Sequence, residues 1–175
     1  MNKITAAITA VGAYVPDYVL TNKILETLVD TNDEWITTRT GIKERRILKD
    51  DTKGTSFLAI NAALDLIKKA NIDPLEIDLL IMATATADMP VASTGSYVAT
   101  EIVATNAFSY DLQSACSSFL FGMSTAATYI ESGRYKKVLL IGADKMSSIV
   151  DYTDRATCII FGDGAGAVLF EPNYE

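Results

Sequence analysis

The apolar residues of this chain gather in short runs that are separated by segments with helical spacing. Each run is rich in β-branched side chains or is bounded by turn residues, which predicts a buried strand. The predicted strands are 4–15, 79–84, 107–112, 137–143, 158–161 and 165–170. Glycines separate the last two, so we expect these two strands to form an antiparallel pair joined by a tight turn.

Capping residues and apolar periodicity predict helices between the strands. The clearest is Ser56 to Ala70, whose apolar residues recur at three- and four-residue steps and predict one apolar face. The residues of this face are Phe57, Ile60, Leu64 and Ile67. Other helical segments are predicted at 22–29, 32–41, 73–76, 94–104 and 115–132.

Strands that alternate with helices indicate an α/β fold with a mostly parallel sheet, and the antiparallel last pair makes the sheet mixed. The 175 residues are 49% hydrophobic and 21% charged, which is typical of a globular domain with its own core. We find no repeat, low-complexity segment or internal linker in the sequence. We therefore expect a single domain over residues 1–175.

The formal net charge of −7 does not indicate a nucleic-acid partner, because no block of lysine and arginine interrupts it. The densest basic spot, residues 43–46, is interpreted as a solvated strand or loop rather than an anion site. The run from Ile4 to Val15 loosely resembles a signal peptide, but its β-branched residues and the following Pro16-Asp17 turn favour a strand. No apolar run approaches the ~20 residues that a membrane span requires, so no membrane association is expected.

The two cysteines and the absence of histidine restrict the chemistry. Cys116 and Cys158 do not form a CxxC pair, so we predict no metal site, and a reducing cytoplasmic setting fits best. Cys158 lies in an apolar run and is interpreted as a core residue. The chain has no histidine, so it cannot complete a Cys-His or Ser-His pair by itself.

Cys116 is the candidate nucleophile. A predicted strand ends near Leu112 and a helix begins near Ala115, which places the thiol in the first helical turn. Free N–H groups and the positive end of the helix dipole favour a thiolate there. The helix that follows is apolar nearly all round, which predicts that it is buried. A structural cysteine in the core is the alternative that placement alone leaves open.

Several segments in one order resemble an enzyme family. Residues 113–119 (QSACSSF) are similar to the nucleophile segment of thiolase-fold condensing enzymes. Residues 31–36, 39–42, 154–155 and 161–167 are similar to the 3-oxoacyl-[acyl carrier protein] synthase III (ketoacyl synthase III) family. The resemblance extends to the end of the chain. It implies the N-terminal half of such an enzyme, with the C-terminal half absent.

The resemblance implies a fold and a reaction. Each half of these enzymes is a five-stranded mixed sheet flanked by helices. Cys116 takes a short acyl group from acyl-CoA, which is a substrate and not a cofactor, and condenses it with decarboxylated malonyl-acyl carrier protein to start fatty-acid synthesis. The backbone N–H of Cys116 is one oxyanion-hole donor, and the other half supplies the second donor, a histidine and an asparagine. A homodimer is expected, and no metal or redox cofactor is implied.

A coenzyme A site in this half is also implied by the resemblance. Trp35 stacks on the adenine with Arg155 on its other side, and Thr31 and Arg39 bind the nucleotide end. The physical chemistry agrees, since indole and guanidinium groups stack well and arginine suits phosphates. A partly buried helix anchor is the alternative for Trp35. The glycine-rich run 162–166 lacks the G-x-G-x-x-G spacing and predicts a tight turn, which by resemblance lies near the active site.

One position departs from the family pattern. Many relatives have a bulky aromatic residue before Pro-Ser-Thr, where this chain has Val91 before Ala92-Ser93-Thr94. In the family this residue gates the acyl pocket by reaching across the dimer. The smaller Val91 therefore predicts an acyl pocket that admits a longer or branched primer.

Two other functions remain open. A hydroxymethylglutaryl-CoA synthase or a secondary-metabolite starter synthase shares the thiolase fold, although the segment with Trp35 and Arg39 favours the fatty-acid branch. Alternatively, the 175 residues alone are a non-catalytic fragment that folds and dimerises, because the histidine and asparagine are missing. Such a fragment would also expose the apolar surface on which the other half packs.

Overall fold

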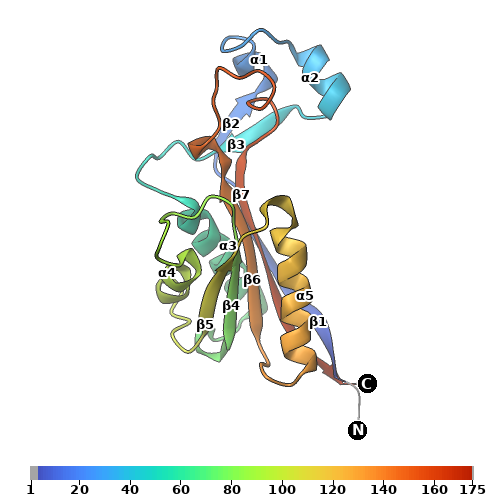
Figure 1. The fold of residues 1–175 in the computed structure, drawn as a ribbon, viewed down its shortest axis with the longest axis vertical. Coiled ribbons are helices and arrows are strands. Elements are labelled where there is room, and N and C mark those ends of the chain that lie inside the picture. Colours follow the sequence, from blue (N-terminus) through green and yellow to red (C-terminus); the bar gives the residue numbers. More distant parts are fainter. Residues whose placement is uncertain (1–3, 175) are drawn as a thin grey trace.

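The centre of the computed structural model, which describes residues 4–174, is a five-stranded sheet (Figure 1). The strand order is β1 (Ile4–Tyr14), β7 (Asp163–Tyr174), β6 (Val138–Lys145), β4 (Leu79–Ala83) and β5 (Phe108–Leu112). β4 is parallel to β5 and β6, whereas β7 is antiparallel to β6 and β1. The predicted α/β class with a mixed five-stranded sheet flanked by helices is confirmed, and the last strand, β7, is antiparallel to both of its neighbours.

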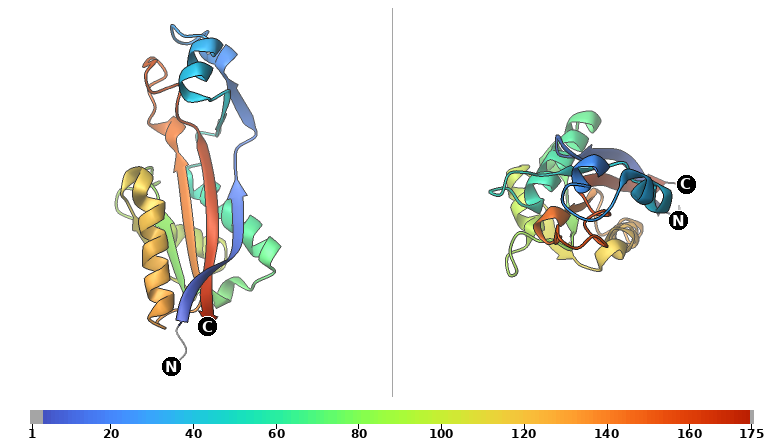
Figure 2. Two further views of the ribbon diagram at one scale, coloured as in Figure 1. Left: turned by 90° about the vertical axis from the view of Figure 1, so that its right-hand side faces the viewer. Right: turned by 90° about the horizontal axis from the view of Figure 1, so that it is seen from above.

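Helices cover both faces of this sheet (Figures 1 and 2). α3 (Thr55–Ala70) and α4 (Thr94–Glu101) lie on one face, and α5 (Ser118–Glu131) lies alone on the other. β4 is buried along its whole length, because its side chains alternate between the two layers. Leu80 and Met82 pack with α3 and α4, and the alternate residues pack with α5: Leu79, Ile81 and Ala83.

The core face of α3 is only in part the predicted one, since Phe57, Ile60 and Ile67 pack against the core as partly buried residues. Its apolar residues with no exposed surface are Leu58, Ala59, Ala62, Ala63 and Leu66. Leu64, which was assigned to the apolar face, is 45% exposed. The prediction followed the large side chains, whereas three of the five fully buried residues are alanines. Gly12 of β1 lies directly against the backbone of this face at Ala62 and Leu66.

Two helices are shorter than predicted. α1 spans Asn22–Leu25 and α4 stops at Glu101, whereas we expected ends at 29 and 104. Past the end of α4, Val103 has a φ of 63°, and the N–H of Ala104 bonds to the Ala99 carbonyl at 2.8 Å. This left-handed helix ending usually contains glycine, so a valine at this position gives no visible stop signal.

A small lobe lies beyond one end of the main sheet (Figure 1). It contains the paired strands β2 (Tyr18–Thr21) and β3 (Glu44–Ile47) together with α1 and α2 (Asp33–Thr40). With the turn segment 151–161, these elements form what we call the cap lobe. Its buried core consists of Leu20, Leu25, Ile36, Ile47, Cys158 and Ile159. β2 was not predicted.

The basic spot at residues 43–46 is only partly solvated. It forms most of β3, so a strand was a correct alternative. Arg45, however, is 4% exposed and points into the protein, which makes the solvated interpretation wrong for this residue. Strand alternation explains the difference, because Arg45 and Ile47 face inward while Glu44 is exposed.

The predicted pair of strands at 158–161 and 165–170 does not form. Residues 151–161 make successive turns, held in part by Asp154, which accepts hydrogen bonds from the Ala156 N–H and the Thr157 hydroxyl at 2.9 and 2.6 Å. The glycine-rich run lies at the start of β7 and is not a turn, because it pairs with both β1 and β6. Cys158 is buried as predicted, but in the cap lobe and not in a strand.

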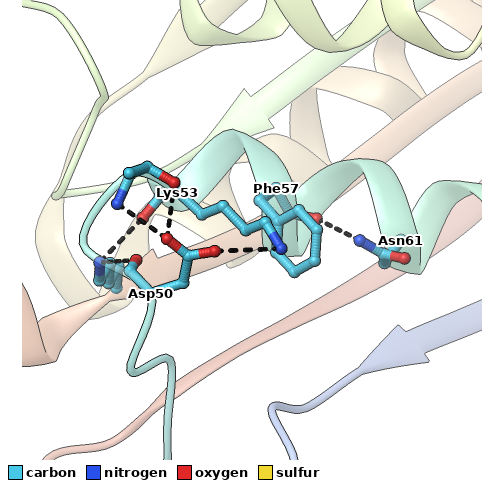
Figure 3. Close-up of polar contacts among 6 residues, drawn as sticks. Asp50, Lys53, Phe57 and Asn61 are labelled. Carbon is cyan, nitrogen blue, oxygen red and sulfur yellow. Dashed lines mark hydrogen bonds and ion pairs between the residues drawn. The ribbon is translucent and has the colours of Figure 1, made fainter.

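Lys145, at the end of β6, fastens the loop that leads into α3. This residue is 8% exposed, and its Nζ donates to the carbonyl oxygens of Asp50 and Lys53 at 3.0 and 2.8 Å. Figure 3 shows the same loop, with Asp50 paired to Lys53 at 3.2 Å and the Lys53 ammonium over the Phe57 ring. The Thr52 hydroxyl, its N–H and the Lys53 ammonium lower the pKa of Asp50 to about 2.

A methyl group at position 12 should destabilise the fold. A Cβ on Gly12 would lie 2.4 Å from the Ala62 carbonyl oxygen and 2.6 Å from the Leu66 nitrogen, and both are backbone atoms. We expect Gly12→Ala to lower the free energy of unfolding by about 1–3 kcal/mol, because β1 or α3 must shift. Chemical denaturation measures this change.

Gly166→Ala in the neighbouring strand β7 is the matched control, since a Cβ there meets no atom within 4 Å. We expect its effect to stay within about 0.5 kcal/mol. Equal destabilisation by the two substitutions would contradict the close packing of β1 on α3.

Candidate active site

The carboxyl ends of β4, β5 and β6 meet at the edge of the sheet that faces the cap lobe (Figure 1). A pocket of about 500 Å³ opens there, and most of its lining is apolar. Its lining comes from β6, from the start of β7, from the loop after β4 and from the segment that leads into α5, and it includes Ala85, Cys116, Phe119, Gly142, Asp144 and Gly164. Ligand sites of open α/β sheets form at this edge, because several loops converge on it.

Cys116 is exposed at this pocket on a short 3-10 turn, Ala115–Ser117, that precedes α5. The sequence predicted Cys116 in the first turn of the helix itself, whereas the α-helix begins only at Ser118. The difference arises at Ala115, whose φ of 46° is left-handed and delays the helix. Such a conformation costs a non-glycine residue about 1–2 kcal/mol. The Ser114 N–H donates to the buried Ser118 Oγ at 2.5 Å, which stabilises the turn.

The backbone N–H of Cys116 has no hydrogen-bond partner among residues 4–174. The next N–H, that of Ser117, bonds to the Ser114 carbonyl at 3.1 Å. A free N–H beside a nucleophilic sulfur is the type of donor that stabilises a developing oxyanion. The turn therefore offers both a thiol and a backbone donor at the pocket.

The packing of α5 brings this turn against the sheet. A Cβ on Gly122 would meet Leu140 of β6 at 2.5 Å, and one on Gly142 would meet the Phe119 ring at 2.9 Å. The sequence predicted that α5 is buried nearly all round. In residues 4–174 this is wrong, because Leu120 of α5 is 65% exposed. One sheet face covers only one stripe of a helix, and the buried stripe is Ser118, Gly122, Ala126 and Ile130.

Asp144 also lines the pocket and was missed in the sequence. Its Oδ1 accepts hydrogen bonds from the Thr84 and Thr86 hydroxyls at 3.0 and 2.9 Å, and from the Ala85 and Thr86 N–H groups at 2.8 and 3.1 Å. This carboxylate holds the loop after β4 against β6 and so forms one wall of the pocket. The available signal was a polar residue directly after a buried strand.

Asp163, the first residue of β7, links the residue that follows β3 to the turn that follows β6. It is 5% exposed, and its Oδ2 accepts from the Leu48 N–H and the Ser147 hydroxyl at 2.8 and 2.6 Å. Its Oδ1 accepts from the Ser147 N–H at 2.8 Å. We had interpreted the glycine-rich run only as a turn, so this anchoring role was also missed.

Three of the four residues expected at a coenzyme A site lie together in the cap lobe. The Cζ atoms of Arg39 and Arg155 lie 4.7 and 5.1 Å from the centroid of the Trp35 ring, which is within cation–π distance. Asn32 caps α2 by accepting from the Trp35 N–H at 2.8 Å. Thr31 precedes this cap, and its buried Oγ1 has no hydrogen-bond partner in the described part of the chain.

The turn segment 151–161 connects this cluster to the pocket, because it carries Arg155 and ends at Phe161, which lines the pocket beside Cys116. Val91 joins neither group. It is 98% exposed and lies at a separate pocket on the loop before α4. Val91 therefore does not line the pocket that contains Cys116.

No three histidine, cysteine, aspartate or glutamate side chains in residues 4–174 gather into a group that suits a metal ion. No helix in the same range is long and apolar enough to cross a bilayer.

A mixed five-stranded sheet with a cysteine on the turn before the helix that covers one face defines a thiolase-like α/β half. Residues 110–175 match the family model described as 3-oxoacyl-[acyl-carrier-protein (ACP)] synthase III. The chain is 58% identical over all 175 residues to the β-ketoacyl-[acyl-carrier-protein] synthase III of Porphyromonas gingivalis and covers 52% of it. The chain thus spans about half the length of the curated relatives that it matches.

Solved structures agree with this relationship. The 3-oxoacyl-[acyl-carrier-protein] synthase III of Aquifex aeolicus has a TM-score of 0.92 and 46% identity, over 95% of this chain and 53% of its own. The priming β-ketosynthase of the R1128 polyketide pathway has a TM-score of 0.92 and 35% identity, over 96% of this chain and 50% of its own. The chain is a homologue of 3-oxoacyl-[acyl-carrier-protein] synthase III and corresponds to its N-terminal half.

The two cysteines should differ in reactivity. Cys116 is exposed, whereas Cys158 has no exposed surface. Burial is the main cause that raises the pKa of the Cys158 thiol, and the negative charge of the nearby Asp154 carboxylate raises it further. We expect iodoacetamide to add a single group to the native chain and a second one only after unfolding in urea. Intact mass spectrometry counts the adducts. Cys116→Ser should show none before unfolding, and native labelling of Cys158 would contradict its burial.

Proposed function

We propose that residues 1–175 are the N-terminal half of a condensing enzyme that starts fatty-acid synthesis, with Cys116 as the acyl-accepting nucleophile. The main support is the exposed Cys116 thiol at a mostly apolar pocket, on the turn before α5. An apolar pocket with a few polar groups suits a short acyl chain. The 58% identity to a relative named β-ketoacyl-[acyl-carrier-protein] synthase III points to the same chemistry.

In the proposed first step, the Cys116 thiolate attacks the thioester carbonyl of acyl-CoA. The bond between that carbonyl carbon and the coenzyme A sulfur breaks, and the coenzyme A thiolate leaves and takes up a proton. The acyl group is then held as a thioester on Cys116. The unpartnered N–H of Cys116 is one donor to the oxyanion of this step, and the C-terminal half supplies the second.

In the second step, malonyl-acyl carrier protein loses carbon dioxide, and the resulting carbanion attacks the acyl-Cys116 carbonyl. A carbon–carbon bond forms and the bond to the cysteine sulfur breaks, which releases the 3-oxoacyl product and regenerates Cys116. A histidine and an asparagine of the C-terminal half assist the decarboxylation. Since the 175 residues contain no histidine, we propose that they do not catalyse condensation alone.

The exposed side of α5 supports a second half that packs on it. Leu120 and Phe121 are 65% and 53% exposed, beside the turn that carries Cys116. Uncovered apolar side chains on a helix favour association with another apolar surface. In the proposed enzyme the C-terminal half covers them, residues 1–175 act as one domain, and two complete chains form a homodimer. The cytoplasmic location expected from the sequence stays a prediction.

Coenzyme A is proposed to bind at the Trp35 cluster, with the adenine between Trp35 and Arg155 and with Arg39 and Thr31 at the nucleotide end. A base between two stacking surfaces needs about 7 Å, which is twice a contact distance of about 3.5 Å. The Arg155 Cζ is 5.1 Å from the Trp35 centroid, so this side chain must move aside. Its ion pair with the exposed Asp30 is 3.6 Å long and offers little resistance.

A starter synthase of secondary metabolism is the second candidate. The R1128 priming β-ketosynthase supports it, because its structure contains the same half-fold at 35% identity. The identity of the required second substrate separates the candidates. A requirement for malonyl-acyl carrier protein fits either synthase, and acetyl-CoA as the preferred primer favours the fatty-acid branch. A requirement for acetoacetyl-CoA would instead indicate a hydroxymethylglutaryl-CoA synthase.

Acylation of Cys116 is the direct test of the proposal. We expect a single acetyl adduct by intact mass spectrometry after incubation with acetyl-CoA, when the chain is combined with a C-terminal half, and no adduct on Cys116→Ala. An adduct on the 175 residues alone would mean that the turn before α5 is sufficient to activate the thiol. No adduct even with the second half present would refute Cys116 as the nucleophile.

Enlarging position 91 tests the primer prediction in the full-length enzyme. We expect Val91→Phe to lower kcat/KM for branched or longer acyl-CoA primers by roughly 10- to 200-fold, because one methylene in an apolar pocket has effects of this size. Activity with acetyl-CoA should change little, and Val91→Ile is the conservative control. Wild-type enzyme that uses only acetyl-CoA, together with an unchanged range in Val91→Phe, would exclude a gating role.

A further inference from the structure

Arg45 of β3 is a buried cation without a carboxylate partner. It is 4% exposed, and no ion pair within residues 4–174 includes it. Burial lowers the pKa of Arg45. An apolar side chain usually stabilises such a position at least as well as an unpaired charge does. The contribution of Arg45 therefore comes from the groups that its hydrogen bonds connect and not from its charge.

One side of the guanidinium holds the turn segment. Arg45 Nε donates to the carbonyl oxygen of Ile159 at 2.9 Å, and Nη2 donates to the same oxygen. Ile159 is itself buried in the core of the cap lobe. Arg155 belongs to this turn segment, so the bonds to Ile159 fix the base from which the Arg155 side chain extends.

The other side of the guanidinium holds α2 through an asparagine. Arg45 Nη1 donates to the Oδ1 of Asn22 at 2.5 Å, and Asn22 is 2% exposed. The Nδ2 of Asn22 donates to the Asp33 carboxylate at 2.7 Å and to the Ile42 carbonyl at 2.8 Å. Asp33 is the first residue of α2 and Ile42 follows its last turn. A single amide therefore fixes both ends of the helix that carries Trp35.

We infer that Arg45 is a positioning residue for the nucleotide end of coenzyme A: through Ile159 and Asn22 it sets the spacing between α2 and the turn segment, and with it the spacing of Trp35 and Arg155. This inference rests on the proposed function, which supplies the nucleotide. Arg155 stays free to open, because Arg45 holds the backbone at Ile159 and not the Arg155 side chain. Lysine cannot replace Arg45, since a single ammonium lacks the planar fork that reaches Ile159 and Asn22 together.

Trp35 makes the test selective, because it is the only tryptophan of the chain and its fluorescence reports on this cluster. Coenzyme A is titrated into the wild type, Arg45→Met, Arg45→Lys and Asn22→Ser, at a temperature where circular dichroism shows each to be folded. We expect the Kd of coenzyme A to rise about tenfold or more in both Arg45 variants, because small displacements of binding groups have large effects. Asn22→Ser should weaken binding in the same direction.

Arg46→Met is the matched control on the same strand. Arg46 is part-exposed, and it contacts Glu44 at 3.9 Å and the Pro16 carbonyl at 3.2 Å, with no hydrogen bond to α2 or the turn segment. The Kd of coenzyme A for Arg46→Met should equal that for the wild type. An Arg45→Lys variant that binds like the wild type would overturn the inference, because charge alone would then be sufficient. If Arg45→Met does not fold, the Kd of coenzyme A for Asn22→Ser tests the inference instead, and an unchanged Kd would contradict it.

A ligand-free measurement separates this inference from the proposed function. If wild-type fluorescence does not respond to coenzyme A, the proposal that coenzyme A binds at the Trp35 cluster is refuted. The exposure of Trp35 can still be measured by acrylamide quenching. We expect the Arg45 variants and Asn22→Ser to raise the Stern–Volmer constant of Trp35, and Arg46→Met to leave it unchanged. Equal constants in all variants would show that Arg45 does not position the cluster.

Discussion

The complete burial of β4 is the constraint on which the rest of this structure depends. Its side chains are covered by α3 and α4 on one face and by α5 on the other, so its parallel neighbours β5 and β6 are held in a fixed register. The carboxyl ends of all three strands then open toward the cap lobe. Cys116 follows β5 and Asp144 lies near the end of β6, so the packing of the sheet itself creates the pocket.

The acidic side chains around the pocket fasten loops to one another. Asp111 accepts from the N–H groups of Thr94 and Gly95 at 2.8 and 2.7 Å, where α4 begins. Asp144 holds the loop after β4, and Asp163 joins the residue after β3 to the turn after β6. Hydrogen bonds between a carboxylate and backbone N–H groups are among the strongest in proteins. Three of the acidic residues behind the net charge of −7 therefore stabilise the fold through these hydrogen bonds.

Features with local signals could be predicted from the sequence, and features that depend on distant partners could not. α2 was predicted because Asn32 caps it and Gly41 ends it with a φ of 73°. The strand at 158–161 was wrong, because a buried turn segment is as apolar as a buried strand. The segment that carries Cys116 was placed at the start of a helix from its own residues and the family resemblance, but the left-handed Ala115 that precedes α5 gave no signal. The buried hydrogen bonds of Arg45 were missed, because its partner Ile159 lies far along the chain.

The pairing of β1 with β7 has a consequence for synthesis on the ribosome. β1 pairs with β7 from Ile4 opposite Tyr174 to Tyr14 opposite Ala165, so residues 15–162 must be made before β7 exists. At 5–20 residues per second this takes about 7–30 s, during which an apolar strand has emerged without its partner. α3 is made much earlier and packs on Gly12. The nascent chain can therefore cover one face of β1 with α3 until β7 has been synthesised.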